Sequence, residues 1–236
     1  VCVAVLLAAT GCTSATVPGT DTAPSSATTQ WGSFVDVRIG ALEADENFSS
    51  SSVEQWVKQT DFVAVVRIES EEEIPPAKVE IERGEGLIGR SVTASVEKLV
   101  WSHPQVKQKL PDTFTFNAFG WAFKNGLDSK FRIGLGDQPY LLPGHNYVMA
   151  LRYVVFGCPR RIDPEDCDPV KVWAPLGSQA IIPFDGTLGA GEFEGKKTEQ
   201  AGSKDTEKTF RKAMLGQDTD WIAKSLSQVA ADDPKL

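Results

Sequence analysis

A series of strand-like segments, separated by turns instead of long helices, is the strongest constraint on the fold. Residues 61–70 (DFVAVVRIES) begin with a β-branched apolar run, which is typical of a buried central strand. Residues 91–101 (SVTASVEKLVW) alternate apolar and polar side chains, and residues 113–119 (TFTFNAF) do the same with Phe114 and Phe116 on one face. Further strands are expected over residues 146–156, 171–175 and 178–184, and turns at Pro143-Gly144 and Asp185-Gly186. Strands joined in this way favour an antiparallel sheet.

Helical patterning occurs on either side of the strands. Residues 52–60 (SVEQWVKQT) place apolar side chains at helical spacing, with Ser52 as the expected N-cap. Residues 205–215 and 218–231 have the same spacing, and Asp218 is the expected N-cap of the second. The sequence therefore predicts a mainly β fold: a small antiparallel OB-like barrel with a short helix before the first core strand and two C-terminal helices.

The N-terminal residues differ in character from the rest. Residues 1–9 (VCVAVLLAA) form an apolar run of the length expected for a signal-peptide core. Thr10, Gly11 and Cys12 follow, and this arrangement resembles the lipobox of bacterial lipoproteins, in which small residues precede a diacylated cysteine. Ala9 stands where that family usually has leucine or another aliphatic residue. No Lys or Arg precedes the apolar run, so we expect the natural leader to start further upstream.

A segment poor in apolar residues follows the cysteine. Residues 13–30 (TSATVPGTDTAPSSATTQ) cannot bury enough apolar surface to offset their chain entropy. An N-terminal strand with a buried free cysteine is the alternative for the leader, and it does not account for this segment. We expect a signal peptide over residues 1–11, the lipidated Cys12 with a disordered tether over residues 12–30, and one globular domain over residues 31–236. The resemblance implies an extracytoplasmic, palmitate-carrying lipoprotein held to the cell membrane through Cys12.

A second resemblance concerns the globular domain, over about residues 52–184. A short helix followed by TDFVAVVRIES, SVTASVEKLVW and LLPGHNYVMAL is similar to a pattern of secreted bacterial proteins. Those proteins are thought to adopt an OB-type barrel like the netrin-like and metalloproteinase-inhibitor modules. The inhibitory mechanism of those inhibitors is not implied here. It needs a free N-terminal cysteine packed on the barrel, whereas Cys12 is expected to be acylated and separated from the domain by the tether.

Two cysteines and an acidic loop form the next candidate site. Cys158 and Cys167 enclose PRRIDPED, and in an exported protein such a pair is expected to form a disulfide. Metal binding is the alternative, although His103 and His145 lack ligand spacing. The acidic loop residues form a weak calcium-site candidate without the glycine and distal glutamate of an EF-hand, and a solvated acidic loop is the alternative. They are Asp163, Glu165, Asp166 and Asp168.

An aromatic segment, FTFNAFGWAF, supplies the candidate binding surface. Phe119, Trp121 and Phe123 have the opposite strand parity to Phe114 and Phe116, so they are predicted to face outward when the latter fill the core. The alternative is a β-bulge at the intervening glycine that switches the parity and returns all five side chains to the core.

The composition limits the classes of function. A net charge of −8 disfavours nucleic acid as a partner. The sequence lacks a nucleophile-elbow motif and a phosphate-binding loop, and its two histidines show no catalytic pattern, so neither catalytic residues nor cofactors are predicted. We expect a binding module that acts on an envelope protein, peptide or glycan. A carboxylate-based hydrolase of wall polymers and a structural accessory lipoprotein without a ligand are the alternatives.

Overall fold

The computed structural model describes residues 40–42, 50–135, 138–156, 170–193, 196–198 and 209–233, which all belong to one compact unit, Ser33–Leu236. The strands are β1 (Gly40–Leu42), β2 (Phe62–Ile74), β3 (Glu85–Ser102), β4 (Thr113–Lys124), β5 (Phe131–Leu135), β6 (Asn146–Phe156), β7 (Val170–Pro175), β8 (Ile181–Pro183), β9 (Gly191–Phe193) and β10 (Lys196–Thr198). The helices are α1 (Val53–Gln59), α2 (Lys78–Arg83), α3 (Phe210–Met214) and α4 (Thr219–Asp232), with short 3-10 turns η1 (Leu127–Ser129) and η3 (Ser178–Ala180).

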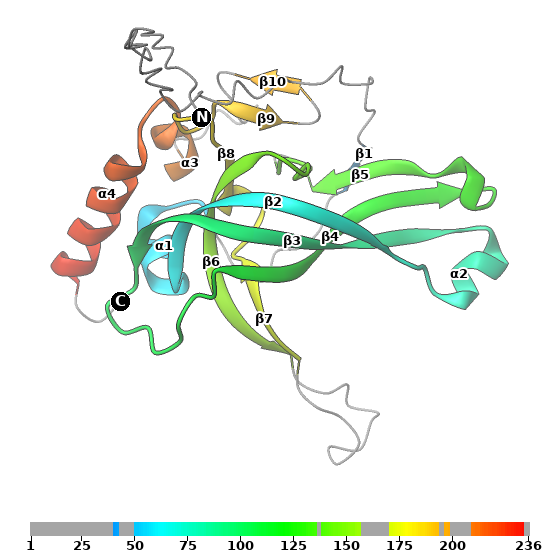
Figure 1. Ribbon diagram of the computed structural model, residues 1–236, viewed down its shortest axis with the longest axis horizontal. Helices are drawn as coiled ribbons and strands as arrows, with labels where there is room; N and C mark the ends of the chain where they lie inside the picture. The colour runs from blue at the N-terminus through cyan, green and yellow to red at the C-terminus, as the bar shows by residue number, and fades with distance from the viewer. Residues whose placement is uncertain are drawn as a thin grey trace, which may run out of the picture. The chain divides into compact units, whose positions relative to one another are not determined.

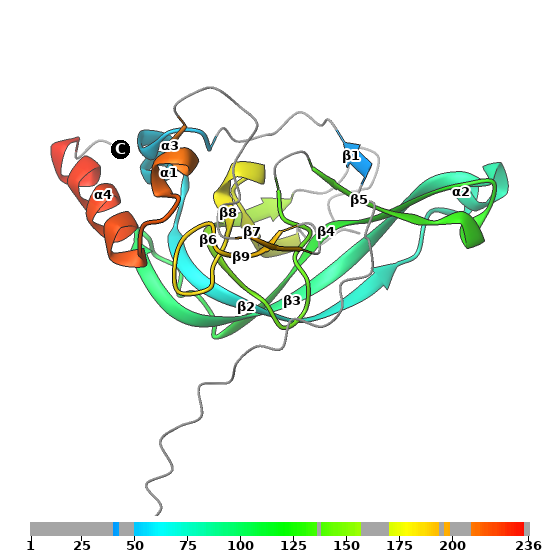
Figure 2. The same ribbon diagram turned by 90° about the horizontal axis from the view of Figure 1, so that it is seen from above.

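Eight strands form one strongly curved sheet, and the predicted mainly β fold is confirmed (Figure 1). The strand order is β1-β5-β4-β3-β2-β6-β7, and β8 also pairs with β6. The β1–β5 pairing is parallel, and the other pairings of this sheet are antiparallel. Figure 2 shows the curvature of β2 and β3, and β4 approaches β7 without pairing with it. The hydrogen-bonded path is open at β1 and β7, so the described strands do not form a closed barrel.

Strand β2 is the central strand that the sequence predicted. It pairs with β3 on one side and with β6 on the other, and both of its faces are buried over its first half. Val63 and Val65 belong to a core cluster that includes residues of α1, α3 and α4, whereas Ala64 and Val66 belong to a second cluster with residues of β3, β4, β6 and β7. Two cores on opposite faces explain why the β-branched run shows no polar alternation.

Helices α1 and α4 begin where the sequence predicted. The Ser52 side chain accepts a hydrogen bond from the backbone N–H of Gln55, whose side chain completes a capping box at the start of α1. The Asp218 side chain caps α4 in the same way, by accepting from the backbone N–H of Trp221. Within the described residues α3 covers only part of residues 205–215, because it begins after the N-cap Thr209.

The hairpin formed by β2 and β3 is longer than predicted at its distal end. The sequence predicted strands over residues 61–70 and 91–101, but the pairing continues to Ile74 and back from Glu85. Glutamate is a poor strand former, yet Glu71 stands opposite Val92 and Glu73 stands opposite Arg90. Glu71 forms an ion pair with Arg90, and Glu73 forms one with Lys130. The extended hairpin carries α2 at its end, and neither α2 nor β5 was predicted.

Candidate functional site

A β-bulge at Gly120 decides where the aromatic segment points. Ile88 on β3 stands opposite Trp121, and Gly89 stands opposite Phe119, so Gly120 is the extra residue on β4. A side chain here would not fit, because a Cβ built on Gly120 lies 2.7 Å from the carbonyl oxygen of Ile88. The bulge that the sequence offered as an alternative is therefore present.

The bulge separates the three residues of the predicted surface. Trp121 and Phe123 lie on the face that holds Phe114 and Phe116, whereas Phe119 lies on the opposite, outer face. Phe123 is 2% exposed, so its assignment to a binding surface was wrong: the switch in parity returns it to the interior. Phe119 and Trp121 are half-buried, on opposite faces, and cannot form one continuous surface with Phe123.

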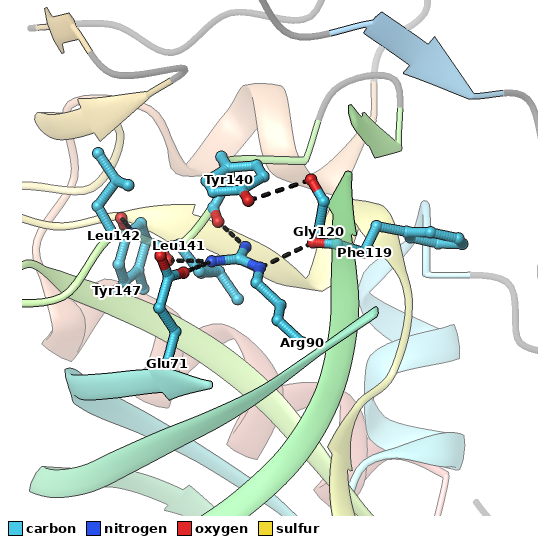
Figure 3. Close-up of polar contacts among 8 residues, drawn as sticks. All are labelled: Glu71, Arg90, Phe119, Gly120, Tyr140, Leu141, Leu142 and Tyr147. Atoms are coloured by element: carbon cyan, nitrogen blue, oxygen red, sulfur yellow. Dashed lines mark hydrogen bonds and ion pairs between the residues drawn. The ribbon is translucent and has the colours of Figure 1, made fainter. Parts of the chain in front are cut away.

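A buried arginine lies directly beside this bulge (Figure 3). Arg90 on β3 is 2% exposed, and its Nε donates a hydrogen bond to the Phe119 carbonyl oxygen at 2.7 Å. Its Nη1 donates to Glu71 Oε2 at 2.5 Å and to the Leu141 carbonyl oxygen at 2.8 Å, and its Nη2 donates to the Tyr140 carbonyl oxygen. One guanidinium thus joins β2, β4 and the segment before β6, which satisfies the requirement that a buried charge be paired and hydrogen-bonded.

The ring of Tyr140 lies over this guanidinium. The Arg90 Cζ atom is 3.7 Å from the centre of the Tyr140 ring, and the Cζ atom of the half-buried Arg132 is 5.1 Å from it. The Tyr140 hydroxyl donates a hydrogen bond to the carbonyl oxygen of Gly120, at 3.1 Å. Burial raises the pKa of the Tyr140 hydroxyl to about 12, an effect that the positive charge of Arg90 partly offsets. Tyr140 therefore stays neutral and acts as a hydrogen-bond donor.

The segment that follows Tyr140 is held in an unusual backbone conformation. Leu141 has a φ of 58°, in the left-handed region that residues other than glycine rarely adopt, and its side chain is fully buried. Its carbonyl oxygen accepts from Arg90, and the next residue, Leu142, donates its N–H to the Tyr147 hydroxyl at 3.0 Å. These bonds hold Leu141 in place, so the cluster fixes the approach of the chain to β6.

The Arg90 cluster acts as a structural anchor. Its guanidinium is buried and donates to three carbonyl oxygens and one carboxylate. Arg90 was not among the predicted site residues, although the sequence contains a signal for it. It has the same strand parity as Val92 and Ala94, which places a charge on an apolar face. A charged residue in register with core residues indicates a buried, paired site.

We expect replacement of Tyr140 by phenylalanine to lower the free energy of unfolding by about 1 kcal/mol near pH 8, because the hydrogen bond to Gly120 is lost. The difference should shrink or reverse by pH 11. The tyrosine ionises near pH 10 in the unfolded chain but only near pH 12 when folded, so the unfolded state of the natural protein is favoured as the pH rises through this window. Urea unfolding at both pH values measures this, and a constant difference would contradict it.

A second feature is a group of exposed apolar side chains at the end of the sheet that carries α2. Figure 1 shows the position of α2 at this end. The residues of this group, between 41% and 58% exposed, are Val79, Ile81, Leu87, Leu127 and Phe131, and we call them the tip patch. Leu87 and Phe131 both stand opposite Ala122 on β4, so their side chains lie on one face of the sheet.

The two turns that carry the tip patch are joined to each other. The N–H of Gly126, before η1, donates a hydrogen bond to the carbonyl oxygen of Gly84, which ends α2 with a left-handed φ of 75°. The carboxylate of Glu80 on α2 accepts from the backbone N–H groups of Ala77 and Leu87. These hydrogen bonds hold together the turns that carry the exposed apolar side chains.

The remaining predicted sites lie outside the described residues. They are Cys12, the Cys158 and Cys167 pair, and the acidic loop residues Asp163, Glu165, Asp166 and Asp168. Among the residues that the structure does describe, there is no group of three or more side chains suited to holding a metal ion. Nor does the described part of the chain contain a helix that is long and apolar enough to cross a membrane. Comparison with protein-family models, with curated proteins and with solved structures found no match to this chain.

Proposed function

We propose that this chain is a lipid-anchored extracytoplasmic lipoprotein whose globular domain acts as a binding module in the bacterial cell envelope. The observation that carries the proposal is the order of three N-terminal features. The apolar residues 1–9 are followed by Gly11-Cys12 and then by the Ser/Thr/Pro-rich residues 13–30. Each feature has a role in a lipoprotein: export, acylation and separation of the domain from the membrane.

The domain offers surfaces that suit a binding role. On the outer face of β4, the half-buried Phe119 adjoins the exposed Asn117 and Thr115 on the same strand face. Aromatic and uncharged polar side chains together favour a protein, peptide or glycan as the partner. The net charge of −8 disfavours nucleic acid.

Two finer expectations belong to this proposal. The curved sheet is an open relative of the OB-like barrel, a view supported by the approach of β4 to β7. Cys158 and Cys167 form a disulfide that closes the loop between β6 and β7, as expected outside the cytoplasm. Alkylation of the denatured, unreduced protein followed by mass measurement tests the disulfide, because paired cysteines take up no reagent.

Replacement of Cys12 by alanine tests the anchor. Expressed from its natural gene in a bacterial host, the unaltered protein is expected in the membrane fraction with a diacylglycerol-sized mass on Cys12. The Cys12→Ala variant should lose this mass and lose the acyl anchor. Cys2→Ala is the matched control, because Cys2 lies in the same apolar leader but follows Val1, whereas the small Gly11 precedes Cys12. Equal modification of all three proteins, or of none, would contradict the proposal.

A further inference from the structure

We propose that the tip patch rests against the surface of the lipid bilayer and so orients the anchored domain. This inference builds on the proposed lipid anchor and names a second contact with the same membrane. Its first support is the gathering of exposed apolar side chains. Of the large hydrophobic residues exposed in the described part of the chain, five form the tip patch: Val79, Ile81, Leu87, Leu127 and Phe131. An exposed apolar group of this kind marks a protein or membrane contact.

The position of the patch favours a bilayer over a protein partner. Val79 and Ile81 lie on α2, and Leu127 lies on η1. Figures 1 and 2 show α2 at the outer end of the β2–β3 hairpin. No residue of α2 is buried, so these aliphatic side chains make no contribution to a core. Apolar side chains on projecting turns can enter the headgroup layer of a bilayer individually, without a complementary groove.

The local charge is also suited to a membrane surface. Around the patch, residues 73–88 and 122–131 hold four basic and five acidic side chains, so that this end of the sheet carries about one negative charge while the whole chain carries −8. The basic residues are Lys78, Arg83, Lys124 and Lys130, and the acidic residues are Glu73, Glu80, Glu82, Glu85 and Asp128. An anionic leaflet repels an acidic domain, and a nearly neutral end presents little of that repulsion.

The chain also enters the described sheet close to the patch. β1 is the first described element, and its parallel pairing sets Gly40 beside Ile133, two residues along β5 from Phe131. The expected tether that follows Cys12, residues 13–30, holds 18 residues, and a flexible chain of that length spans roughly 23 Å. An acylated Cys12 would therefore keep the tip patch within reach of the bilayer at a high effective concentration, at which even weak contacts form.

Photo-crosslinking tests the contact. The full acylated protein is placed on vesicles of phosphatidylethanolamine and phosphatidylglycerol that contain a phosphatidylcholine with a diazirine in its acyl chain. After irradiation, peptide mass spectrometry is expected to find lipid adducts on peptides that hold Leu87, Leu127 and Phe131. Peptides with Val155 and Val170 serve as the control, because these valines are equally exposed but lie at the far end of the β6–β7 pair.

A pair of variants completes the test. The double variant Leu127→Gln, Phe131→Gln should lose at least about nine-tenths of the adducts at the tip, whereas Val155→Gln, Val170→Gln should keep them. An acylated, vesicle-bound protein without tip adducts would overturn the orientation inference alone. A protein without the diacylglycerol mass on Cys12 would overturn the anchor. Tip adducts that persist unchanged in the Leu127→Gln, Phe131→Gln variant would likewise overturn the membrane contact.

Discussion

Replacement of Arg90 by leucine is expected to lower the free energy of unfolding by about 3–5 kcal/mol. Arg90 is 2% exposed, and its guanidinium donates to the carbonyl oxygens of Phe119, Tyr140 and Leu141 and to the carboxylate of Glu71. Leucine leaves all of these acceptors without their donor, and an unpaired buried acceptor loses its hydration without compensation. Urea unfolding followed by tryptophan fluorescence measures the change.

Arg132 provides the matched control for this prediction. Its Cζ atom lies 5.1 Å from the centre of the same Tyr140 ring, but the residue is only half-buried, whereas Arg90 is 2% exposed. We expect Arg132→Leu to cost less than about 1 kcal/mol, the scale of an exposed cation–π contact. Equal losses for the two arginines would show that the buried hydrogen bonds of Arg90 contribute little, and would contradict the role given to the cluster.

The pair formed by Arg90 and Glu71 has a further consequence. Because the cost of removing one partner includes the charge left behind, the double variant Arg90→Leu, Glu71→Leu should be less destabilised than the sum of the two single variants. The double variant should still be less stable than the natural protein, because the three carbonyl oxygens lose Arg90 as their donor, as they do in Arg90→Leu.

The local patterns of the sequence predicted a large part of this fold. The uninterrupted β-branched apolar run placed β2 at the centre of the sheet, and the residue types at Ser52 and Asp218 marked the starts of α1 and α4. Such signals depend on neighbours within a few residues, which is why they can be interpreted without the structure.

Other parts of the structure depend on contacts between distant residues. The distal end of β2 contains Glu71 and Glu73, whose strand conformation is stabilised by ion pairs with Arg90 of β3 and with Lys130, which precedes β5. Curvature and closure of the sheet depend on how β4 approaches β7, which no local pattern encodes. The β2–β3 hairpin predicted from local propensity was therefore too short. The OB-type resemblance predicted a closed barrel, which the described strand pairing does not form.

In the candidate sites, too, some features follow from the local sequence and others depend on contacts between distant residues. The sequence located the bulge residue Gly120, but the choice between bulge and regular strand needed the register of β3 against β4, which moved Trp121 and Phe123 inward. Arg90 could have been found from its parity with Val92, but its partners lie up to 51 positions away in the chain. A single buried charge thus indicates that a site exists without identifying what completes it.

Replacement of Trp56 by alanine is expected to remove about 3–5 kcal/mol from the free energy of unfolding, the range for a large aromatic side chain lost from a core. Trp56 is fully buried, and its Nε1 donates to the Ser50 carbonyl oxygen at 2.8 Å. Its ring meets that of Phe210 edge to face, at 5.2 Å, and Phe210 stacks on Trp221 at 5.9 Å. These three rings join α1, α3 and α4 on one face of the sheet.

The position of Trp56 predicts which parts of the fold lose stability in the variant. Trp56 belongs to the cluster on the helical face, whereas the cluster containing Phe114 and Phe116 lies on the other face of β2. Hydrogen exchange in Trp56→Ala should therefore accelerate in α3 and α4 more than in β3 and β4, because local opening follows the contacts that are lost. Trp56→Phe keeps most of the ring packing and should retain most of the stability. Uniform acceleration across both faces would show instead that the two clusters unfold as one unit.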